Sequence, residues 1–403
     1  MKLESVRIPH GLRGSAIGSA FDADALFDVA IVDGHVAAIT PALNPAAGTG
    51  GLLLSGLVDA HTHIDKGYTV QEVGAAQGNL FDAIRRMEAH RAGWTSAVIE
   101  ARMQRAVNDA WHHGTRALRT HLDWPTAGAP PSLAAFERTR EAWHGRMALQ
   151  FVSLTPLDVL AEADNAERIA HAVRRANGVL GAFIYRNDGI VHKLGRVFDV
   201  AQSMGLALDL HVDEGLDADA TGLRSIAQLA IARGMHNRIV CGHACALSMQ
   251  DDPQAGETLA LCAQAGIHLV ALPTTNLYLQ GAWDRTPVAR GITRIREAAA
   301  HGVRASLASD NVQDAFYPYG SYDLLETFGL GVQAAHLAPA LDWLDAITVS
   351  PAQALGLAWD GRIAPGCPAD LVLLAATGEH ELLDGRGRRR TVIRNGKILE
   401  NQT

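Results

Sequence analysis

Two histidines separated by a single residue stand just after an apolar run, in the segment Gly56-Leu-Val-Asp-Ala-His-Thr-His63. On a β-strand, residues i and i+2 face the same side, so the imidazoles of His61 and His63 can converge on one point. Such a pair is suited to binding a metal ion, although a His-rich turn at the surface would have the same sequence. Two histidines alone do not hold a metal tightly, so further ligands must come from later in the chain.

Three later residues of a suitable type, His211, His243 and Asp310, stand where apolar segments of the chain end. A lone histidine or aspartate in such a place is more often a structural hydrogen-bonding residue, but several together favour a shared metal site. Asp310 is suited to two tasks. It can contact the metal and accept a proton from a bound water, because a carboxylate beside a cation is ionised at neutral pH.

Glu214 lies three residues beyond His211, at the start of the following loop. A carboxylate so close to a metal ligand can reach the bound water or the substrate without binding the metal itself, as a proton shuttle must. A surface acid or a helix-capping acid is the structural alternative, and the neighbouring Asp213 fits that alternative better.

These residues need elements that bring them together, and the chain from 55 to 355 alternates apolar strand-like segments with segments of helical composition such as 96–113 and 165–177. Helices must cover each continuously apolar strand, so a parallel (β/α)8 barrel of the TIM type is the economical arrangement. In such barrels the chemistry lies at the carboxyl ends of the strands. The predicted strands span 52–60, 115–121, 147–155, 179–185, 207–211, 238–243, 268–272 and 303–309.

Short strand-like segments occur at both ends of the chain. Segments 28–33 and 36–39 flank a Gly-containing turn, and Asn395-Gly396 is a strong hairpin-turn signal near the C-terminus. Neither end has enough strands to bury a face alone. We therefore predict that residues 1–54 and 356–403 together form one small β-sandwich domain beside a barrel of residues 55–355.

Composition narrows the class of partner. With 48% hydrophobic and 19% charged residues the chain has the composition of a globular protein, and its net charge of −8 argues against nucleic acid and for a small-molecule substrate. There is no N-terminal signal segment and no apolar run long enough for a membrane span, so no membrane partner and a cytoplasmic location are expected. Large barrels with apolar helices often associate, so a homo-oligomer is compatible with the sequence.

Other chemistries lack support. The sequence has no Gly-x-Ser-x-Gly elbow, no P-loop and no early Gly-x-Gly-x-x-Gly, so serine-acyl, phosphoryl and hydride transfer are not indicated. The four cysteines are too scattered for a disulfide framework and are expected to be small buried side chains.

The order His-x-His, His, His and Asp over such a barrel resembles the amidohydrolase superfamily, and within it bacterial cytosine deaminase and its relatives, including the triazine-ring aminohydrolases. The likeness covers nearly the whole chain. It is carried by His61-Thr-His-Ile-Asp65, Arg119-Thr-His-Leu-Asp123, His211-Val-Asp-Glu214, Asn276-Leu-Tyr-Leu-Gln-Gly281, Arg290-Gly-Ile-Thr-Arg294, Ser309-Asp-Asn-Val-Gln-Asp-Ala-Phe-Tyr-Pro318 and Pro365-Gly-Cys-Pro-Ala-Asp-Leu-Val-Leu-Leu374.

The resemblance implies roles for residues of this chain. Glu214 would be the proton shuttle, and His243 would hydrogen-bond the attacking water or the substrate. No lysine ends the fourth predicted strand, where Tyr185-Arg186-Asn187 stands, so one divalent ion is expected rather than a bridged pair. Imidazole and carboxylate ligands suit both Fe²⁺ and Zn²⁺. The implied metal ligands are His61, His63, His211 and Asp310.

Departures from the family pattern concern the substrate. Cytosine deaminases read the pyrimidine amide edge with a glutamine after strand three, whereas this chain has Pro156 there, which disfavours cytosine itself. Lys66 follows the first motif, as in the triazine aminohydrolases, and a cation at the barrel mouth favours a substrate with an acidic ring or carboxylate. A salt bridge of Lys66 with Asp65, or a position in a solvated loop, is the structural alternative.

Three further residues stand near the predicted mouth. Asn311 takes the place of a second aspartate, Phe316 stands where an aromatic ring can cover the substrate, and Trp124 is expected in the core rather than at the mouth. The leading hypothesis is hydrolytic deamination of a small nitrogen heterocycle, such as a cytosine-like pyrimidine, with release of ammonia. One alternative is removal of an alkylamine from a triazine-type ring. Another is a non-catalytic, metal-dependent ligand-binding barrel, which would have no use for a shuttle at Glu214.

Overall fold

The computed structural model describes residues 1–18, 21–43, 50–384, 387 and 389–400. Eight strands form one sheet in which every neighbouring pair is parallel, in the order β12-β11-β10-β9-β8-β7-β6-β5. The strands are β5 (Leu57–Thr62), β6 (Thr115–Asp123), β7 (Ala148–Pro156), β8 (Val179–Ile184), β9 (Leu208–Val212), β10 (Ile239–His243), β11 (His268–Ala271) and β12 (Arg304–Leu307).

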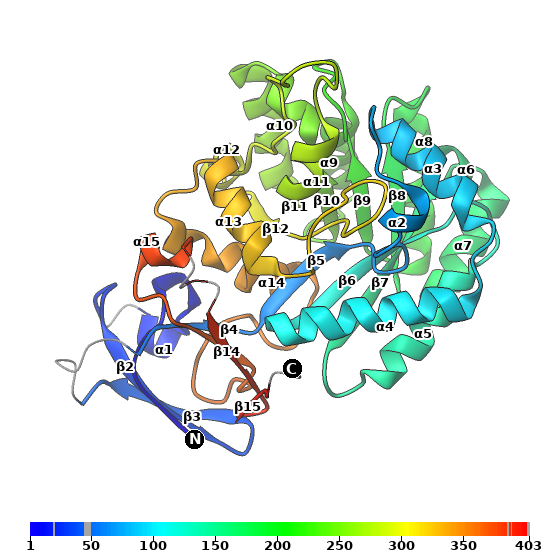
Figure 1. The fold of residues 1–403 in the computed structure, drawn as a ribbon. Coiled ribbons are helices and arrows are strands. Elements are labelled where there is room, and N and C mark those ends of the chain that lie inside the picture. Colours follow the sequence, from blue (N-terminus) through cyan, green and yellow to red (C-terminus); the bar gives the residue numbers. More distant parts are fainter. Residues whose placement is uncertain (19–20, 44–49, 385–386, 388, 401–403) are drawn as a thin grey trace.

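The two outer strands of this sheet meet. Thr62, at the end of β5, forms a parallel bridge with Asp310, just after β12. The amide of Asp310 donates to the carbonyl of His61 at 2.9 Å, and the amide of His63 donates to the carbonyl of Asp310 at 3.2 Å. The sheet therefore closes into the predicted eight-stranded barrel, which helices surround in Figure 1.

The helices that connect and cover the strands are mostly placed as predicted. Segment 96–113 is helical from its first to its last residue, because the Thr95 side chain accepts from the amide of Val98 at 3.3 Å and Gly114 ends the helix at φ 105°. The longer helices of the barrel are α3 (Leu80–Arg91), α4 (Ser96–His113), α5 (Pro131–Ala142), α7 (Ala163–Arg175), α8 (Ile190–Met204), α9 (Gly222–Ala232), α10 (Asp252–Ala265) and α13 (Leu324–Ala334). The shorter ones are α2 (Val70–Val73), α6 (Leu157–Leu160), α11 (Pro273–Leu279), α12 (Ile295–Ala300) and α14 (Val349–Ala354).

A second sheet is built from both chain ends, as predicted, and is drawn at the lower left of Figure 1. Its seven strands are hydrogen-bonded in one continuous order, β15-β14-β13-β4-β1-β2-β3. Both predicted hairpins occur in it, with left-handed φ angles at Asp33-Gly34 and at Asn395-Gly396. The strands are β1 (Lys2–Arg7), β2 (Leu26–Val32), β3 (His35–Pro41), β4 (Leu52–Ser55), β13 (Leu371–Leu374), β14 (Arg390–Arg394) and β15 (Lys397–Ile398).

One strand prediction is corrected. The segment 52–60 is not a single barrel strand, because its first half, β4, pairs with β1 and β13 of the small sheet and only its second half, β5, enters the barrel. The change occurs at Gly56, whose amide donates to Asp370 at 2.8 Å and where a Cβ atom would lie 2.9 Å from the Cβ of Arg116. A glycine thus lets the chain pass closely between the two sheets.

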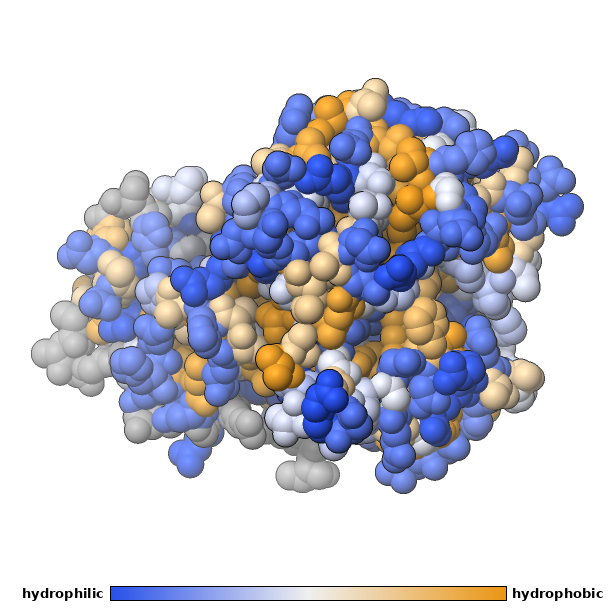
Figure 2. All heavy atoms as spheres, turned by 90° about the horizontal axis from the view of Figure 1, so that it is seen from above, coloured by the Kyte–Doolittle hydropathy of each residue, from blue (hydrophilic) through white to orange (hydrophobic). Residues whose placement is uncertain are grey.

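Helix α3 lies over the mouth of the barrel. Its apolar residues Leu80, Ala83 and Met87 form a buried cluster with Leu279 and Ala315, which follow the adjacent strands β11 and β12. In Figure 2, apolar side chains are spread over the middle of the face seen from above, with hydrophilic side chains around them. None of the described helices is both long and apolar enough to cross a membrane.

Candidate active site

Four side chains converge where β5, β9 and β12 end. The Nε2 atom of His211 lies 3.1 Å from Nε2 of His61 and 3.3 Å from Nε2 of His63. The Oδ1 atom of Asp310 lies 3.2 Å from Nε2 of His63 and 3.5 Å from Nε2 of His61. Ligand atoms around a tetrahedral ion with bonds of about 2.1 Å are roughly 3.4 Å apart, so the spacing fits a single metal ion.

Hydrogen bonding selects the nitrogen that His63 can offer. Its Nδ1 lies 3.2 Å from the carbonyl oxygen of His121, which can only accept, so Nδ1 carries the proton and Nε2 is free to bind a metal. Both carboxylate oxygens of Asp310 are buried without a hydrogen-bond partner among the described residues. Buried polar atoms rarely remain unpaired, so this set is suited to receiving an ion.

Asp310 and the nearby His243 have strained backbone conformations that orient their side chains. Asp310 has φ 59° and His243 has φ 66°, in the left-handed region that side chains other than glycine rarely adopt. The surroundings hold both residues there: Asp310 is fixed by its backbone bonds to β5, and the carbonyl of His243 accepts from the Thr293 hydroxyl at 2.6 Å.

Glu214 and His243 lie beside this set. The Nδ1 atom of His243 is 3.5 Å from Oε1 of Glu214 and 3.1 Å from Oδ1 of Asn276. Burial, and then the negative charge of Asp310, raise the pKa of Glu214 well above its usual range, so this carboxyl is suited to carrying a proton. Burial lowers the pKa of His243, and its Nε2 has no partner among the described residues.

Asp310 stays ionised in spite of its position. Burial acts to raise its pKa, but the contact with His63 and the nearby His243 outweigh burial, and the pKa of Asp310 is lowered. Asp213 takes the capping role predicted for it. Its carboxylate accepts from the amides of Gly222 and Leu223 at 3.2 and 2.9 Å, at the start of α9.

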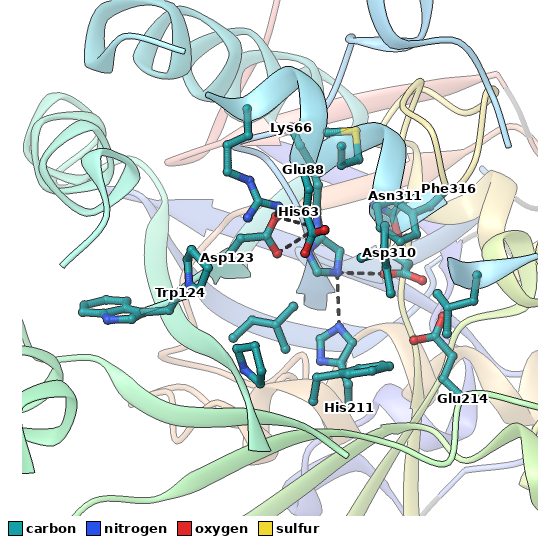
Figure 3. Close-up of a pocket in the computed structure, with 18 of the residues that line it drawn as sticks. His63, Lys66, Glu88, Asp123, Trp124, His211, Glu214, Asp310, Asn311 and Phe316 are labelled. Atoms are coloured by element: carbon teal, nitrogen blue, oxygen red, sulfur yellow. Dashed lines mark hydrogen bonds and ion pairs between the residues drawn. The ribbon is translucent and has the colours of Figure 1, made fainter. Parts of the chain in front are cut away.

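The side chains predicted to bind substrate all line one cavity of about 120 Å³, which is also lined by His63, His211 and Asp310 of the metal-ligand set (Figure 3). Lys66 does not pair with Asp65, the alternative drawn from the sequence; its Nζ lies 3.1 Å from Asp123 and 4.8 Å from the centre of the Phe316 ring. Asn311 donates to Asp314 at 2.6 Å. Trp124 is fully buried in the core, as expected, and nevertheless lines the cavity.

Several cavity residues are not foreseen from the sequence. Asp123 is one, although it closes the motif that begins at Arg119. Others come from α3, where Ile84, Met87, Glu88 and Arg91 face the cavity from one side of the helix. An amphipathic helix carries no signal that its charged residues serve a site. An outer cavity of about 510 Å³, lined by the exposed Phe81 and Val288 among others, shares Leu80 and Glu214 with the inner one.

A second layer of polar side chains, the floor cluster, lies inside the barrel, on strand residues that precede the carboxyl ends. It comprises Arg119, Gln150, Asp209, His268 and Ser306. Arg119 donates to Asp209 at 2.8 Å and to Gln150 at 2.7 and 3.0 Å, and Nε2 of His268 lies 2.6 Å from the Ser306 hydroxyl. We refer to His61, His63, His211, His243, Glu214 and Asp310 as the rim cluster.

His121 stands between these two layers. Its ring stacks on that of His61 at 3.8 Å, and His61, His121 and Asp209 could also hold an ion by their spacing. Because Arg119 already neutralises Asp209, the rim cluster is better suited to a cation.

Comparison with known proteins gives the family. The amidohydrolase family matches residues 152–399, more than half of the chain. The chain belongs to the amidohydrolase family. The sequence of this chain is 38% identical to that of a pterin deaminase of Rhizobium rhizogenes, and the match covers 93% of this chain and 87% of that protein. Its structure is similar to that of 5-methylcytosine deaminase from Klebsiella pneumoniae, with 27% identity, a TM-score of 0.84 and coverage of 100% and 98% of the two chains.

A further solved structure, N-isopropylammelide isopropylaminohydrolase from Burkholderia multivorans, is 26% identical with a TM-score of 0.78, covering 99% of this chain and 98% of that one. The likeness predicted from the sequence motifs, to the deaminases and to the triazine-ring aminohydrolases, is therefore confirmed.

Proposed function

We propose that this amidohydrolase is a metal-dependent deaminase that removes the exocyclic amino group of a nitrogen heterocycle and releases ammonia. The observation that carries the proposal is the meeting, at the inner end of one cavity, of three imidazoles and a carboxylate at metal-ligand spacing, with Glu214 and His243 beside them. The similarity to two deaminases supports the same reaction.

The four converging side chains, His61, His63, His211 and Asp310, would hold the metal. We propose one divalent ion, Fe²⁺ or Zn²⁺, because the set offers four ligand atoms and β8 is followed by Tyr185-Arg186, without a lysine to bridge a second ion. Such an ion, when bound, lowers the pKa of a water molecule so that it becomes a nucleophile near neutral pH.

The other residues then move protons. His243, whose Nδ1 faces Asn276, has Nε2 left to accept a proton, and Asp310 shares this task of orienting and deprotonating the water. The water oxygen bonds to the ring carbon that carries the amino group. Glu214, protonated at the start, gives its proton to the ring nitrogen, takes up the first proton released by the water and gives that one to the amino group, so that the carbon–nitrogen bond breaks and ammonia leaves. The second proton of the water is released as the carbon becomes a carbonyl, and it returns to Glu214 and restores the starting state.

We propose a pterin as the substrate class rather than cytosine. Pro156 lines the cavity where an amide side chain would be needed to read a pyrimidine, and the pterin deaminase is similar over almost the whole chain. Lys66, Asn311 and Phe316, which line the same cavity, are proposed to contact the ring. The domain limits, a homo-oligomer and a cytoplasmic location stay predictions.

A substrate panel on protein loaded with Fe²⁺ or Zn²⁺ tests the function. We expect ammonia from a pterin, little or none from cytosine, and none after the metal is removed with a chelator, with activity restored on reloading. Alkylamine from N-isopropylammelide without ammonia from any pterin would favour the triazine alternative. A metal-loaded protein that acts on no member of the panel would favour a binding protein.

A further inference from the structure

A group of charged side chains lines the cavity beside the rim cluster. The carboxylate of Asp123, at the end of β6, accepts from two cations: Nζ of Lys66 at 3.1 and 3.2 Å and Nη2 of Arg91 at 2.5 Å. The side chains of Lys66, Asp123 and Arg91 are 3%, 13% and 27% exposed, so all three are largely withdrawn from solvent. Lys66 and Arg91 together have more N–H donors than the carboxylate of Asp123 has sites to accept hydrogen bonds.

Arg91 keeps most of its donors free. A guanidinium has five N–H donors, and the bond to Asp123 occupies one nitrogen. The Nε atom of Arg91 is buried and has no partner among the described residues. Asp65 and Asp314 are also near Lys66, but neither lines the cavity. Glu88 lines it but is exposed, so the buried charged groups left for a ligand beside Asp123 are the donors of Arg91 and Lys66.

Helix α3 delivers Arg91 to this place. Leu80, Ile84, Met87 and Arg91 follow each other at steps of four, three and four residues, which is one face of an α-helix, and all four line the cavity. The apolar members fix the helix over the mouth. Arg91 is the last residue of α3, where a cation is also favoured by the helix dipole.

The donors and the proton shuttle lie on different sides of the metal-ligand set. In Figure 3, Asp123 and Trp124 lie to the left of His63 and Glu214 lies to the right. A substrate whose amino-bearing carbon is at the metal ligands, with a ring nitrogen at Glu214, therefore turns another edge of its ring toward Arg91. That edge must accept hydrogen bonds, because a buried donor left facing a donor costs affinity.

A pterin has such an edge. Across the pyrimidine ring from the amino-bearing carbon, its oxo group and the adjacent nitrogen of the second ring point the same way and form a pair of acceptors. Cytosine has an N–H donor opposite its amino-bearing carbon. A planar guanidinium fits paired acceptors particularly well.

We propose that Arg91, held by Asp123 and flanked by Lys66, determines specificity by binding the oxo-and-nitrogen acceptor edge of the substrate. This inference rests on the proposed function. It concerns a residue on the helix over the mouth, away from the metal ligands.

Equilibrium binding tests this without requiring turnover. Lumazine, the deaminated pterin, keeps the acceptor edge, and quinazoline-2,4-dione has a C–H group in place of the ring nitrogen beside the oxo group. For the metal-loaded wild-type protein we expect calorimetry to give at least about a tenfold tighter dissociation constant for lumazine, the size of one hydrogen bond to a charged group. Arg91→Met is expected to remove this preference, and Arg91→Lys, which keeps the charge but not the paired donors, to retain part of it.

The matched control is Arg85→Met on the same helix. The side chain of Arg85 is 69% exposed and does not line the cavity, so this variant should keep the wild-type preference. Equal ratios of the two dissociation constants in wild type and Arg91→Met, with unchanged metal content and circular dichroism, would overturn the inference. Failure of the proposed function shows separately, as a metal-loaded wild-type protein that releases no ammonia from a pterin.

Discussion

The barrel interior contains two polar layers that differ in how far the protein itself satisfies their atoms. In the floor cluster, Arg119 bonds to Asp209 and Gln150, and the amide of Gln150 in turn donates to the carbonyl of Leu355 at 2.8 Å. Most polar atoms of this cluster are hydrogen-bonded to their neighbours, although one oxygen of Asp209 and Nδ1 of His268 have no partner among the described residues. Such a layer can specify how the strands pack, but it offers little to a ligand.

The rim cluster is equally buried, but several of its polar atoms are not hydrogen-bonded to the protein. Both oxygens of Asp310, Nε2 of His243 and Nδ1 of His211 are without hydrogen-bond partners in the described part of the chain. Burial alone therefore does not separate a functional histidine from a structural one, because His268 and His211 are both 3% exposed. Each of these two histidines has an unpaired Nδ1, and the difference lies in Nε2: that of His268 is bonded to the Ser306 hydroxyl, whereas that of His211 faces the Nε2 atoms of His61 and His63. Substitutions in the rim cluster should affect turnover, whereas substitutions in the floor cluster should affect stability.

The largest effect is expected for Glu214→Gln in the rim cluster. The amide has the same shape but cannot carry the proton, so kcat should fall by about 10²- to 10⁴-fold, the usual contribution of a general acid–base group. Metal content, measured by atomic absorption, and the melting temperature should stay near the wild-type values. Near wild-type turnover with metal bound would remove Glu214 from the mechanism and weaken the contrast between the two layers.

In the floor cluster, Arg119→Met is expected to act on stability. The side chains of Arg119 and Asp209 are 5% and 0% exposed, so the substitution leaves a buried carboxylate unpaired and should cost roughly 3–5 kcal/mol of unfolding free energy in a urea titration. The kcat of the folded fraction should change little. The double variant Arg119→Met/Asp209→Leu is the control, and it should regain much of the loss because no charge is left alone. A stable Arg119→Met protein that no longer binds metal would place the floor cluster within the site.

The meeting of the rim-cluster side chains could be predicted from the sequence, because their positions follow from simple rules, whereas their roles stay predictions. Strand alternation puts His61 and His63 on one side, and parallel strands bring their carboxyl ends to one edge, so His211, His243 and Asp310 meet them. His63, His211, His243 and Asp310 all line the same cavity.

The partners of Lys66 and the role of α3 did not follow from such rules. Lys66 pairs with Asp123, which is distant in sequence and is brought near by the pairing of β5 with β6, rather than with its neighbour Asp65. Arg91 reaches the cavity because α3 packs across the mouth, and that packing depends on Leu279 and Ala315, far along the chain. Local periodicity predicts a helix and one apolar face, but not what the face covers.

The smallest effect is expected for His268→Gln, as a change in pH dependence. Burial, and then the charges of Arg304 and Arg119, lower the pKa of His268 to about 3, whereas in the unfolded chain it is near 6.5. Between these two pKa values His268 is protonated in the unfolded state but not in the folded state. The free energy of unfolding therefore decreases as the pH falls below about 6.5. By pH 5 this amounts to about 2 kcal/mol.

Glutamine cannot be protonated, so His268→Gln removes this part of the acid sensitivity. Urea unfolding at pH 7 and pH 5 should show the variant losing about 2 kcal/mol less than the wild type. Acid also protonates the histidines of the rim cluster, but both proteins share that loss and it cancels in the comparison. Equal losses would mean that His268 is not held neutral by the floor cluster, and that this layer is more open to water than its hydrogen bonds indicate.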